Sequence, residues 1–191
     1  TCPATFTSTA SLKTAVQAYN ADPAAAIATY GLIADWDVSA VTDMSYLFKD
    51  LKNFNTDVSS WDTSSVTRMD HMFYGALVFN QPLSFNTSSV MNMGSMFRGA
   101  SAFNQPLSFD TSSVTNMDYM FLSAGAFNQP LSLDTSSVTS MGYVFYSANS
   151  LSAANKLLIR CAWAGTSAFA STGYGSSWGP GTCPATFTST A

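Results

Sequence analysis

Few residues of this sequence could take part in catalysis or metal binding: three cysteines, one histidine and eleven aspartates, with no glutamate. His71 is the single histidine, so it has no second histidine for a metal site or a triad. Asp62, Asp110 and Asp134 recur at a regular interval, as capping residues do. Acidic residues spread in this way supply too few ligands for calcium. The sequence therefore predicts no enzyme, no cofactor and no metal site.

A repeated decapeptide suggests how the cysteines pair. Residues 1–10 and residues 182–191 both read TCPATFTSTA. This identity predicts a longer chain of tandem modules, each equivalent to residues 1–181; a duplicated tag or a domain-swapped chain is the alternative. Cys183 is then the next copy of Cys2. We expect Cys161 to pair with Cys183, and Cys2 to pair with the Cys161 equivalent of the preceding module. Closing this loop would contribute about 3 kcal/mol, whereas a reducing compartment would favour buried free thiols.

A shorter repeat lies within the module. The motif VTDM at 41–44 returns as VTRM at 66–69, VMNM at 90–93, VTNM at 114–117 and VTSM at 138–141. Apolar residues follow at i, i+3, i+6 and i+7, as in Val114, Met117, Met120 and Phe121, which predicts a short helix capped by the preceding Asp/Asn-Thr-Ser-Ser. We expect the methionine stripe to pack in the core rather than to bind metal or peptide. Leu and Phe then alternate in FNQPLSF, as in a half-buried strand.

Together these patterns predict an α/β fold, a leucine-rich-repeat-like solenoid of about five coils of about 24–25 residues, each with one short strand and one short helix. A right-handed β-solenoid is the alternative. We expect an N-terminal helical cap at residues 1–33, the repeats at 34–150 and a C-terminal capping helix at 151–165. A Gly/Ser/aromatic connector would follow at 166–181, and residues 182–191 would start the next module.

Asparagines recur in the repeat after a phenylalanine. We expect their side chains to form a hydrogen-bonded ladder between coils, and a ligand site is the weaker interpretation. The ladder residues are Asn55, Asn80, Asn104 and Asn128. Asn86-Thr87-Ser88 is a sequence for N-glycosylation, although Asn86 also occupies the capping position that Asp holds in other coils.

Charge and hydropathy exclude two classes of partner. Only 9% of residues are charged, the net charge is −4 and the pI is near 4.5, whereas a nucleic-acid-binding surface is basic. No apolar stretch reaches the ~20 residues of a membrane span. A surface with so few charges is expected to be covered by neighbouring copies of the same chain, joined head to tail, or by covalently attached glycans.

The segment YGLIADWDVSAVTDMSYLF and later units such as FNQPLSFDTSSVTNMDYMF resemble the BspA-like leucine-rich-repeat surface proteins. This family includes the repeats of unknown function in mycoplasma surface lipoproteins, and the resemblance covers about residues 11–165. It implies an extracellular or cell-surface location and a link to adhesion, and it carries no catalytic positions. The chain departs from the pattern at Phe85, Phe109 and Leu133, where the family usually has tryptophan.

The function that we expect is that of a non-catalytic structural building block of an extracellular filament or surface stalk. The alternative is an adhesin or ligand-binding repeat array on the cell surface, in which repetition raises avidity. Ice binding by a threonine column is a weaker third hypothesis. That column consists of Thr63, Thr87, Thr111 and Thr135.

Overall fold

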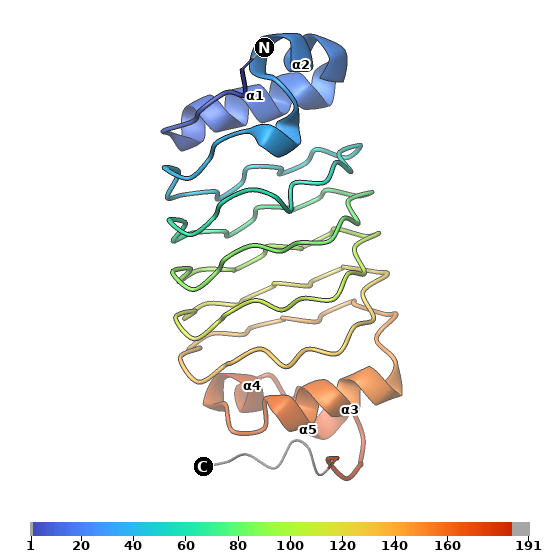
Figure 1. The fold of residues 1–191 in the computed structure, drawn as a ribbon. Helices are drawn as coiled ribbons and strands as arrows, with labels where there is room; N and C mark the ends of the chain where they lie inside the picture. Colours follow the sequence, from blue (N-terminus) through green and yellow to red (C-terminus); the bar gives the residue numbers. More distant parts are fainter. Residues whose placement is uncertain (1, 185–191) are drawn as a thin grey trace.

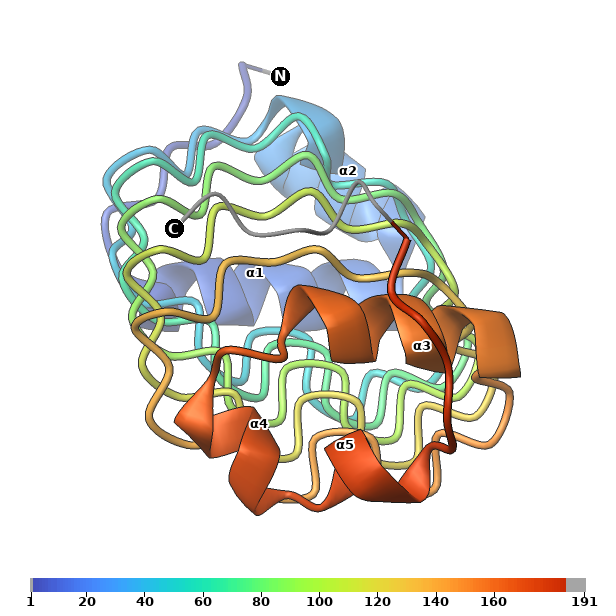
Figure 2. The same cartoon turned by 90° about the horizontal axis from the view of Figure 1, so that it is seen from below.

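The computed structural model describes residues 2–184, which form a stack of irregular coils between two helical ends (Figure 1). At one end lie α1 (Thr9–Ala21), α2 (Pro23–Tyr30) and the 3-10 helix η1 (Ile33–Asp35). At the other end lie α3 (Ala153–Ala162), α4 (Ser167–Ser171) and α5 (Tyr174–Ser177). Viewed along the stack, the coils lie over one another and α3 crosses the near end (Figure 2).

Local signals place the N-terminal helices. The Ser8 hydroxyl accepts a hydrogen bond from the Ser11 N–H and caps α1, and Asp22 caps α2 with Pro23 as its first residue. Gly31 ends α2 with φ of 77°, a conformation that costs a residue with a Cβ more than glycine. α1 covers the end of the stack with the buried residues Leu12, Ala15 and Val16.

The expected α/β fold, with a strand and a helix in each coil, is wrong, and so is the β-solenoid alternative. Between η1 and α3 the chain contains no α-helix and no strand of a sheet, only turns and single bridged residues. Apart from Asp37, which bridges to Thr5, the bridged residues form one parallel column, which runs through Asp43, Arg68, Asn92, Asn116 and Ser140.

Backbone hydrogen bonding explains why the predicted helices are absent. The N–H groups of Met44 and Phe48 donate to carbonyl oxygens of the following coil at 2.9 and 2.8 Å. Between them, the N–H of Leu47 donates to the carbonyl of Met44, three residues earlier. An α-helix needs every amide to bond four residues back along its own chain. Because alternate amides serve the neighbouring coil, this segment forms successive turns instead.

Two residues in each coil also adopt left-handed backbone conformations, which a helix cannot contain. The first position has φ between 54° and 61° and is held by Tyr46, His71, Ser95, Tyr119 and Tyr143. The second position is held by Asp50, Gly75, Gly99, Ser123 and Ser147. Such conformations persist where surrounding contacts over-determine them, and in every coil but the last, inter-coil hydrogen bonds fix the amides at both positions.

The predicted strands are absent for a related reason. Leu107 and Phe109 are buried, so their alternation does mark an inward face. Pro106, however, has no N–H to donate, and coils are joined here by side chains rather than by a backbone ladder. The alternating pattern thus predicts burial correctly and secondary structure wrongly.

The core consists of aromatic columns that run along the stack. Phe73, Phe97 and Phe121 follow one another at centroid distances of 5.7 and 5.6 Å with nearly parallel rings. A second column runs beside it and contains Phe54, Phe79, Phe103 and Phe127. Trp163 closes the first column by stacking on Phe145 at 5.6 Å. The coils therefore share one continuous core that the helices cover at each end.

Candidate functional site

The predicted asparagine residues lie in one column and join consecutive coils. The side-chain oxygen (Oδ1) of Asn80 accepts the N–H of Asn104 at 2.9 Å, and Oδ1 of Asn104 accepts the N–H of Asn128 at 2.8 Å. Asn55 accepts in the same way from Asn80. Glutamine side chains reinforce the column, since Gln129 Nε2 donates to the Asn104 carbonyl at 3.0 Å. The column therefore satisfies backbone groups that no sheet pairs.

The same column passes directly into the C-terminal helix. Asn128 Oδ1 accepts the N–H of Ser152 at 2.8 Å, and Ser152 caps α3 by accepting the N–H of Asn155. Asn155 Nδ2 in turn donates to the Asn128 carbonyl at 2.8 Å, the bond that a glutamine makes in earlier coils. This arrangement fixes where α3 begins relative to the last coil.

The threonine column, for which the sequence suggested ice binding only as a weaker third hypothesis, is buried between the coils. Thr63, Thr87 and Thr111 are at most 1% exposed, and each hydroxyl donates to a carbonyl of the next coil at 2.7–2.9 Å. Thr135 is also buried and bonds to Thr166 in the C-terminal cap. A buried column cannot meet an ice surface, so the ice-binding hypothesis is wrong.

The residues expected to cap helices form local turns instead. Asp110 Oδ1 accepts both the hydroxyl and the N–H of Ser112 at 2.7 and 3.1 Å. These two bonds, the hydroxyl first, lower the pKa of Asp110 below its ordinary value of 3.8. Asn86 makes the same two bonds with Ser88 at 2.8 and 3.2 Å. Asn86 is exposed, so the turn leaves its amide nitrogen facing solvent, and glycosylation there stays a prediction.

At the C-terminal end, α3 holds the following chain segment through two adjacent side chains. Cys161 forms a disulfide with Cys183, with 5.6 Å between the Cα atoms. The Arg160 guanidinium donates to the carbonyls of Gly179 and Gly181, the latter at 2.6 Å. Gly181 also lies against Leu157, where an added Cβ would come within 2.9 Å of a leucine methyl carbon. Residues 179–183 are thus fixed against one face of α3.

The N-terminal end presents the matching part of the repeated decapeptide. Cys2 is exposed and has no disulfide partner within residues 2–184. Two residues later the backbone is hydrogen-bonded to the end of α2, because the Ala4 N–H donates to the Tyr30 carbonyl at 2.9 Å. Thr5 then bridges to Asp37, in parallel. Of the expected next-module segment 182–191, residues 185–191 lie outside the described part of the chain.

An apolar cavity lies beside the disulfide. It has a volume of about 440 Å³ and is lined by residues that include Arg160, Phe169, Gly181 and Cys183. α3, α4 and the segment after α5 all contribute to it. The C-terminal end of the stack therefore carries a hollow at the place where the chain continues toward the repeated decapeptide.

One side of the stack carries aromatic and cationic side chains, which the sequence analysis did not identify as a group. This tyrosine face comprises the side chains two and five residues after each repeat methionine. They are Tyr46, His71, Ser95, Tyr119 and Tyr143 in one row, and Lys49, Tyr74, Arg98, Leu122 and Tyr146 in the other. The cations lie over rings: Arg98 is 5.4 Å from the Tyr74 centroid and 5.6 Å from that of Tyr119. The signal in the sequence was the recurrence of tyrosine at these offsets.

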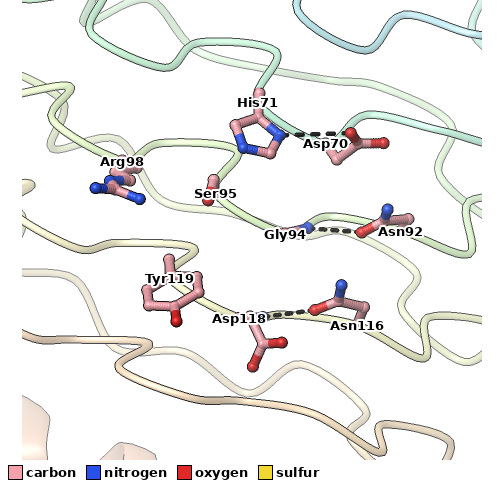
Figure 3. A pocket seen from close by; sticks show the side chains of 9 residues that line it. All are labelled: Asp70, His71, Asn92, Gly94, Ser95, Arg98, Asn116, Asp118 and Tyr119. Carbon is pink, nitrogen blue, oxygen red and sulfur yellow. Dashed lines mark hydrogen bonds and ion pairs between the residues drawn. The ribbon is translucent and has the colours of Figure 1, made fainter.

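A cavity of about 250 Å³ opens on the tyrosine face (Figure 3). His71 and Tyr119 border it along the stack, and Asn92, Asn116 and Arg98 border it across the coils. Asp70 and Asp118 complete its wall. Both of these carboxylates already have partners: Asp70 accepts two bonds from Arg68, and Asp118 accepts the Ser140 hydroxyl at 2.6 Å.

Groups that could perform other chemistry are not assembled. Within residues 2–184, no three His, Cys, Asp or Glu side chains are placed to bind one metal ion. His71 lies 3.4 Å from Asp70 through Nδ1 and stacks on Tyr46 at 4.5 Å. Each helix of this described range is too short or too polar to traverse a lipid bilayer.

Comparison with known proteins places the chain in a family. The model of the family described as "Mycoplasma protein of unknown function, DUF285" matches residues 11–108 and, in a second overlapping match, residues 83–160. The chain belongs to the DUF285 family. No curated protein and no solved structure matches it.

The DUF285 matches coincide with the part of the structure that repeats. They begin within α1, cover the coils and end in α3. Cys2, Cys161 and Cys183 all lie outside the matched residues, so the disulfide is a feature of this chain beyond the DUF285 unit. The family description assigns no function.

Proposed function

We propose that this chain is a non-catalytic structural module of an extracellular filament or surface stalk, built from tandem copies of the unit that residues 1–181 represent. One observation carries the proposal. The disulfide joins the terminal helix α3 to Cys183, the residue that stands in the repeated decapeptide where Cys2 stands in the first copy. In a tandem chain this bond fastens the end of each module to the first residues of the next.

The length of the connection makes such a junction stiff. Two residues after Cys2, Ala4 is already hydrogen-bonded to α2. If the second copy folds like the first, only one residue, a proline, lies between the disulfide-bonded cysteine and the first hydrogen-bonded residue of the next module. Two extended residues span at most about 7 Å. Neighbouring modules would then be in direct contact, with no flexible linker between them.

The two ends of the stack suit such a contact. Residues 2–7 and α1 lie at one end, and α3 to α5 with the segment up to residue 184 lie at the other (Figure 1). The apolar cavity beside the disulfide lies at this second end. At the first end Leu32, two residues after the end of α2, is 56% exposed. Apolar surface on both ends would become buried when one module packs on the next.

An extracellular location is supported by the disulfide between Cys161 and Cys183, because disulfides persist in oxidising compartments. The exposed amide of Asn86 is available to an attached glycan. A surface with 9% charged residues would gain solubility from glycans or from coverage by neighbouring modules. These two kinds of partner, glycans and further copies of the module, belong to the same proposal.

The proposal is tested on native material and on a two-module polypeptide. Electron microscopy should show continuous fibres whose axial repeat is on the order of 40 Å, from five coils about 4.8 Å apart and a helical layer of about 10 Å at each end. Peptide mapping without reduction should link Cys161 of the first copy to the copied cysteine of the second. Isolated globular particles of 20.3 kDa in native material, or a Cys2–Cys161 link within one copy, would refute the proposal.

A further inference from the structure

The cavity on the tyrosine face exists because one position of the aromatic row lacks a ring. Tyr46 stacks on His71 at 4.5 Å between centroids, and Tyr119 stacks on Tyr143 at 5.7 Å. Between these two pairs the coil carries Ser95, whose side chain is too short to fill the row. His71 and Tyr119 are two coils apart, so roughly 10 Å separates their backbones. The missing ring therefore leaves a gap with an aromatic side chain at either side (Figure 3).

Hydrogen-bond donors without protein partners border this gap. Asn92 Oδ1 accepts the Gly94 N–H, and Asn116 Oδ1 accepts the Asp118 N–H, which orients both amides. Their Nδ2 groups donate to no described residue, and Figure 3 shows both amides beside the gap. Arg98 forms no ion pair within the described chain, unlike Arg68, which is paired with Asp70 and Asp43. Three side chains that carry donor groups thus line one small cavity.

The electrostatic balance of the gap favours a neutral ligand. Asp70 and Asp118 contribute two negative charges, while Arg98 and the Arg68 that pairs with Asp70 contribute two positive ones. The chain as a whole carries −4, which disfavours an anionic ligand. A neutral ligand for this site must offer many hydrogen-bond acceptors and one apolar face for an aromatic ring.

We propose that this gap binds a neutral hexopyranose unit of a carbohydrate. The C–H face of a sugar ring packs on an aromatic side chain, here the face of His71 that Tyr46 does not cover, and its hydroxyl groups accept from Arg98 and the two asparagine amides. A pocket that combines apolar walls with a few oriented polar groups is the usual form of a small-ligand site. All of its walls lie within residues 70–119, so the site does not depend on how modules are joined.

A second cavity, of about 410 Å³, extends the site along the same face. It is lined by Tyr143, Tyr146 and Tyr174 and lies one coil beyond Tyr119. Tyr143 lies two coils, roughly 10 Å, beyond Ser95, so a linear oligosaccharide is needed to reach both cavities and a single sugar unit can occupy only one of them. Oligosaccharides should therefore bind more tightly than the corresponding monosaccharide.

The test uses the whole 191-residue chain and two kinds of probe. The first kind consists of the methyl glycosides of glucose, mannose, galactose and N-acetylglucosamine, with their linear oligomers. The second kind consists of L-tryptophan and AMP, two flat ligands of other classes. Saturation-transfer NMR and calorimetry measure the binding. At least one neutral sugar should bind, and neither of the flat ligands should bind more tightly.

The repeat itself offers the blocking variant. Ser95→Tyr places in the gap the residue that Tyr46, Tyr119 and Tyr143 hold at the same backbone position, with φ between 54° and 61°. It should fold like the natural chain and abolish sugar binding. Arg98→Gln should weaken binding about tenfold or more, because a hydrogen bond from a charged donor is lost. Tyr146→Ala should weaken binding of oligomers and leave the monosaccharide unchanged.

Met91→Tyr is the matched control. Met91 belongs to the same coil as Ser95, is 51% exposed and does not line the cavity, so the added ring should leave sugar affinity unaltered. Circular dichroism and urea titration check that each variant folds. If no neutral sugar binds, if Ser95→Tyr binds as tightly as the natural chain, or if only tryptophan or AMP binds, the proposal is wrong.

Discussion

Removal of the Cys161–Cys183 disulfide should lower the free energy of unfolding by an amount that the structure allows us to estimate. The bond closes a loop with a sequence separation of 22 residues. In the chain-entropy relation, a loop of this length corresponds to about 3 kcal/mol at room temperature. We therefore expect the free energy of unfolding of the double variant Cys161→Ser/Cys183→Ser to be about 3 kcal/mol lower than that of the oxidised chain.

Urea titration of the whole chain measures this loss, and tryptophan fluorescence locates it. Trp163 and Trp178 both contact Phe145 in the C-terminal cap, whereas Trp36 and Trp61 stack on each other at the N-terminal end. Because a stack of repeats can unfold in segments, the cap tryptophans should report the change first. The Arg160 bonds to Gly179 and Gly181 remain in the variant and should keep residues 179–181 in place under native conditions.

Cys2→Ser is the control, since Cys2 is exposed and unpaired within the described chain. It should leave the urea midpoint of a single module unchanged. The reasoning would be refuted if the double variant were as stable as Cys2→Ser within about 0.5 kcal/mol. It would also be refuted if a reducing agent left the natural chain unaffected.

Three further substitutions test the asparagine column, the threonine column and the turn at Asp110. Asn104→Ala removes the acceptor for the Asn128 N–H and the Gln129 amide, so urea titration should show a free energy of unfolding lower by about 1–3 kcal/mol. Asn104→Asp keeps an acceptor and should lower this free energy less. Equal losses in the two variants would contradict the role given to Asn104. Thr111→Val removes a hydroxyl that is fully buried and bonded to Asp134, and should cost about 1 kcal/mol. The exposed Thr115→Val is its control and should cost little. The bonds to Ser112 lower the pKa of Asp110 in the folded chain. The stabilisation that ionised Asp110 gives to the folded state is therefore present above its ordinary pKa of 3.8, and it is lost as the pH falls through the lower pKa of the folded state. Asp110→Asn copies the turn at Asn86. Its stability should fall less than that of the natural chain between roughly pH 5 and pH 2, the window over which a depressed carboxylate pKa acts. An unchanged pH dependence would show that Asp110 does not stabilise the folded chain in this way.

The sequence alone determined which side chains enter the core and which recur on the surface. Val114, Met117, Met120 and Phe121 are all buried, as their spacing indicates. This follows because a constant repeat period returns each side chain to the same side of the stack, whatever local backbone conformation connects them. The choice of Cys161 and Cys183 as a pair also came from the sequence, through the position of the repeated decapeptide, and the structure joins these two sulfur atoms.

Tertiary structure alone decided the backbone conformation of the coils. Spacing of i, i+3, i+6 and i+7 suits a helix and equally suits a series of tight turns with the same face buried. The neighbouring coil decides between them, because it offers carbonyl oxygens to alternate amides such as those of Met44 and Phe48. The gap at Ser95 was likewise hidden in the sequence. Ser95 replaces a tyrosine of the repeat, but only the stacking of the coils, with His71 on one side of Ser95 and Tyr119 on the other, turns this replacement into a cavity.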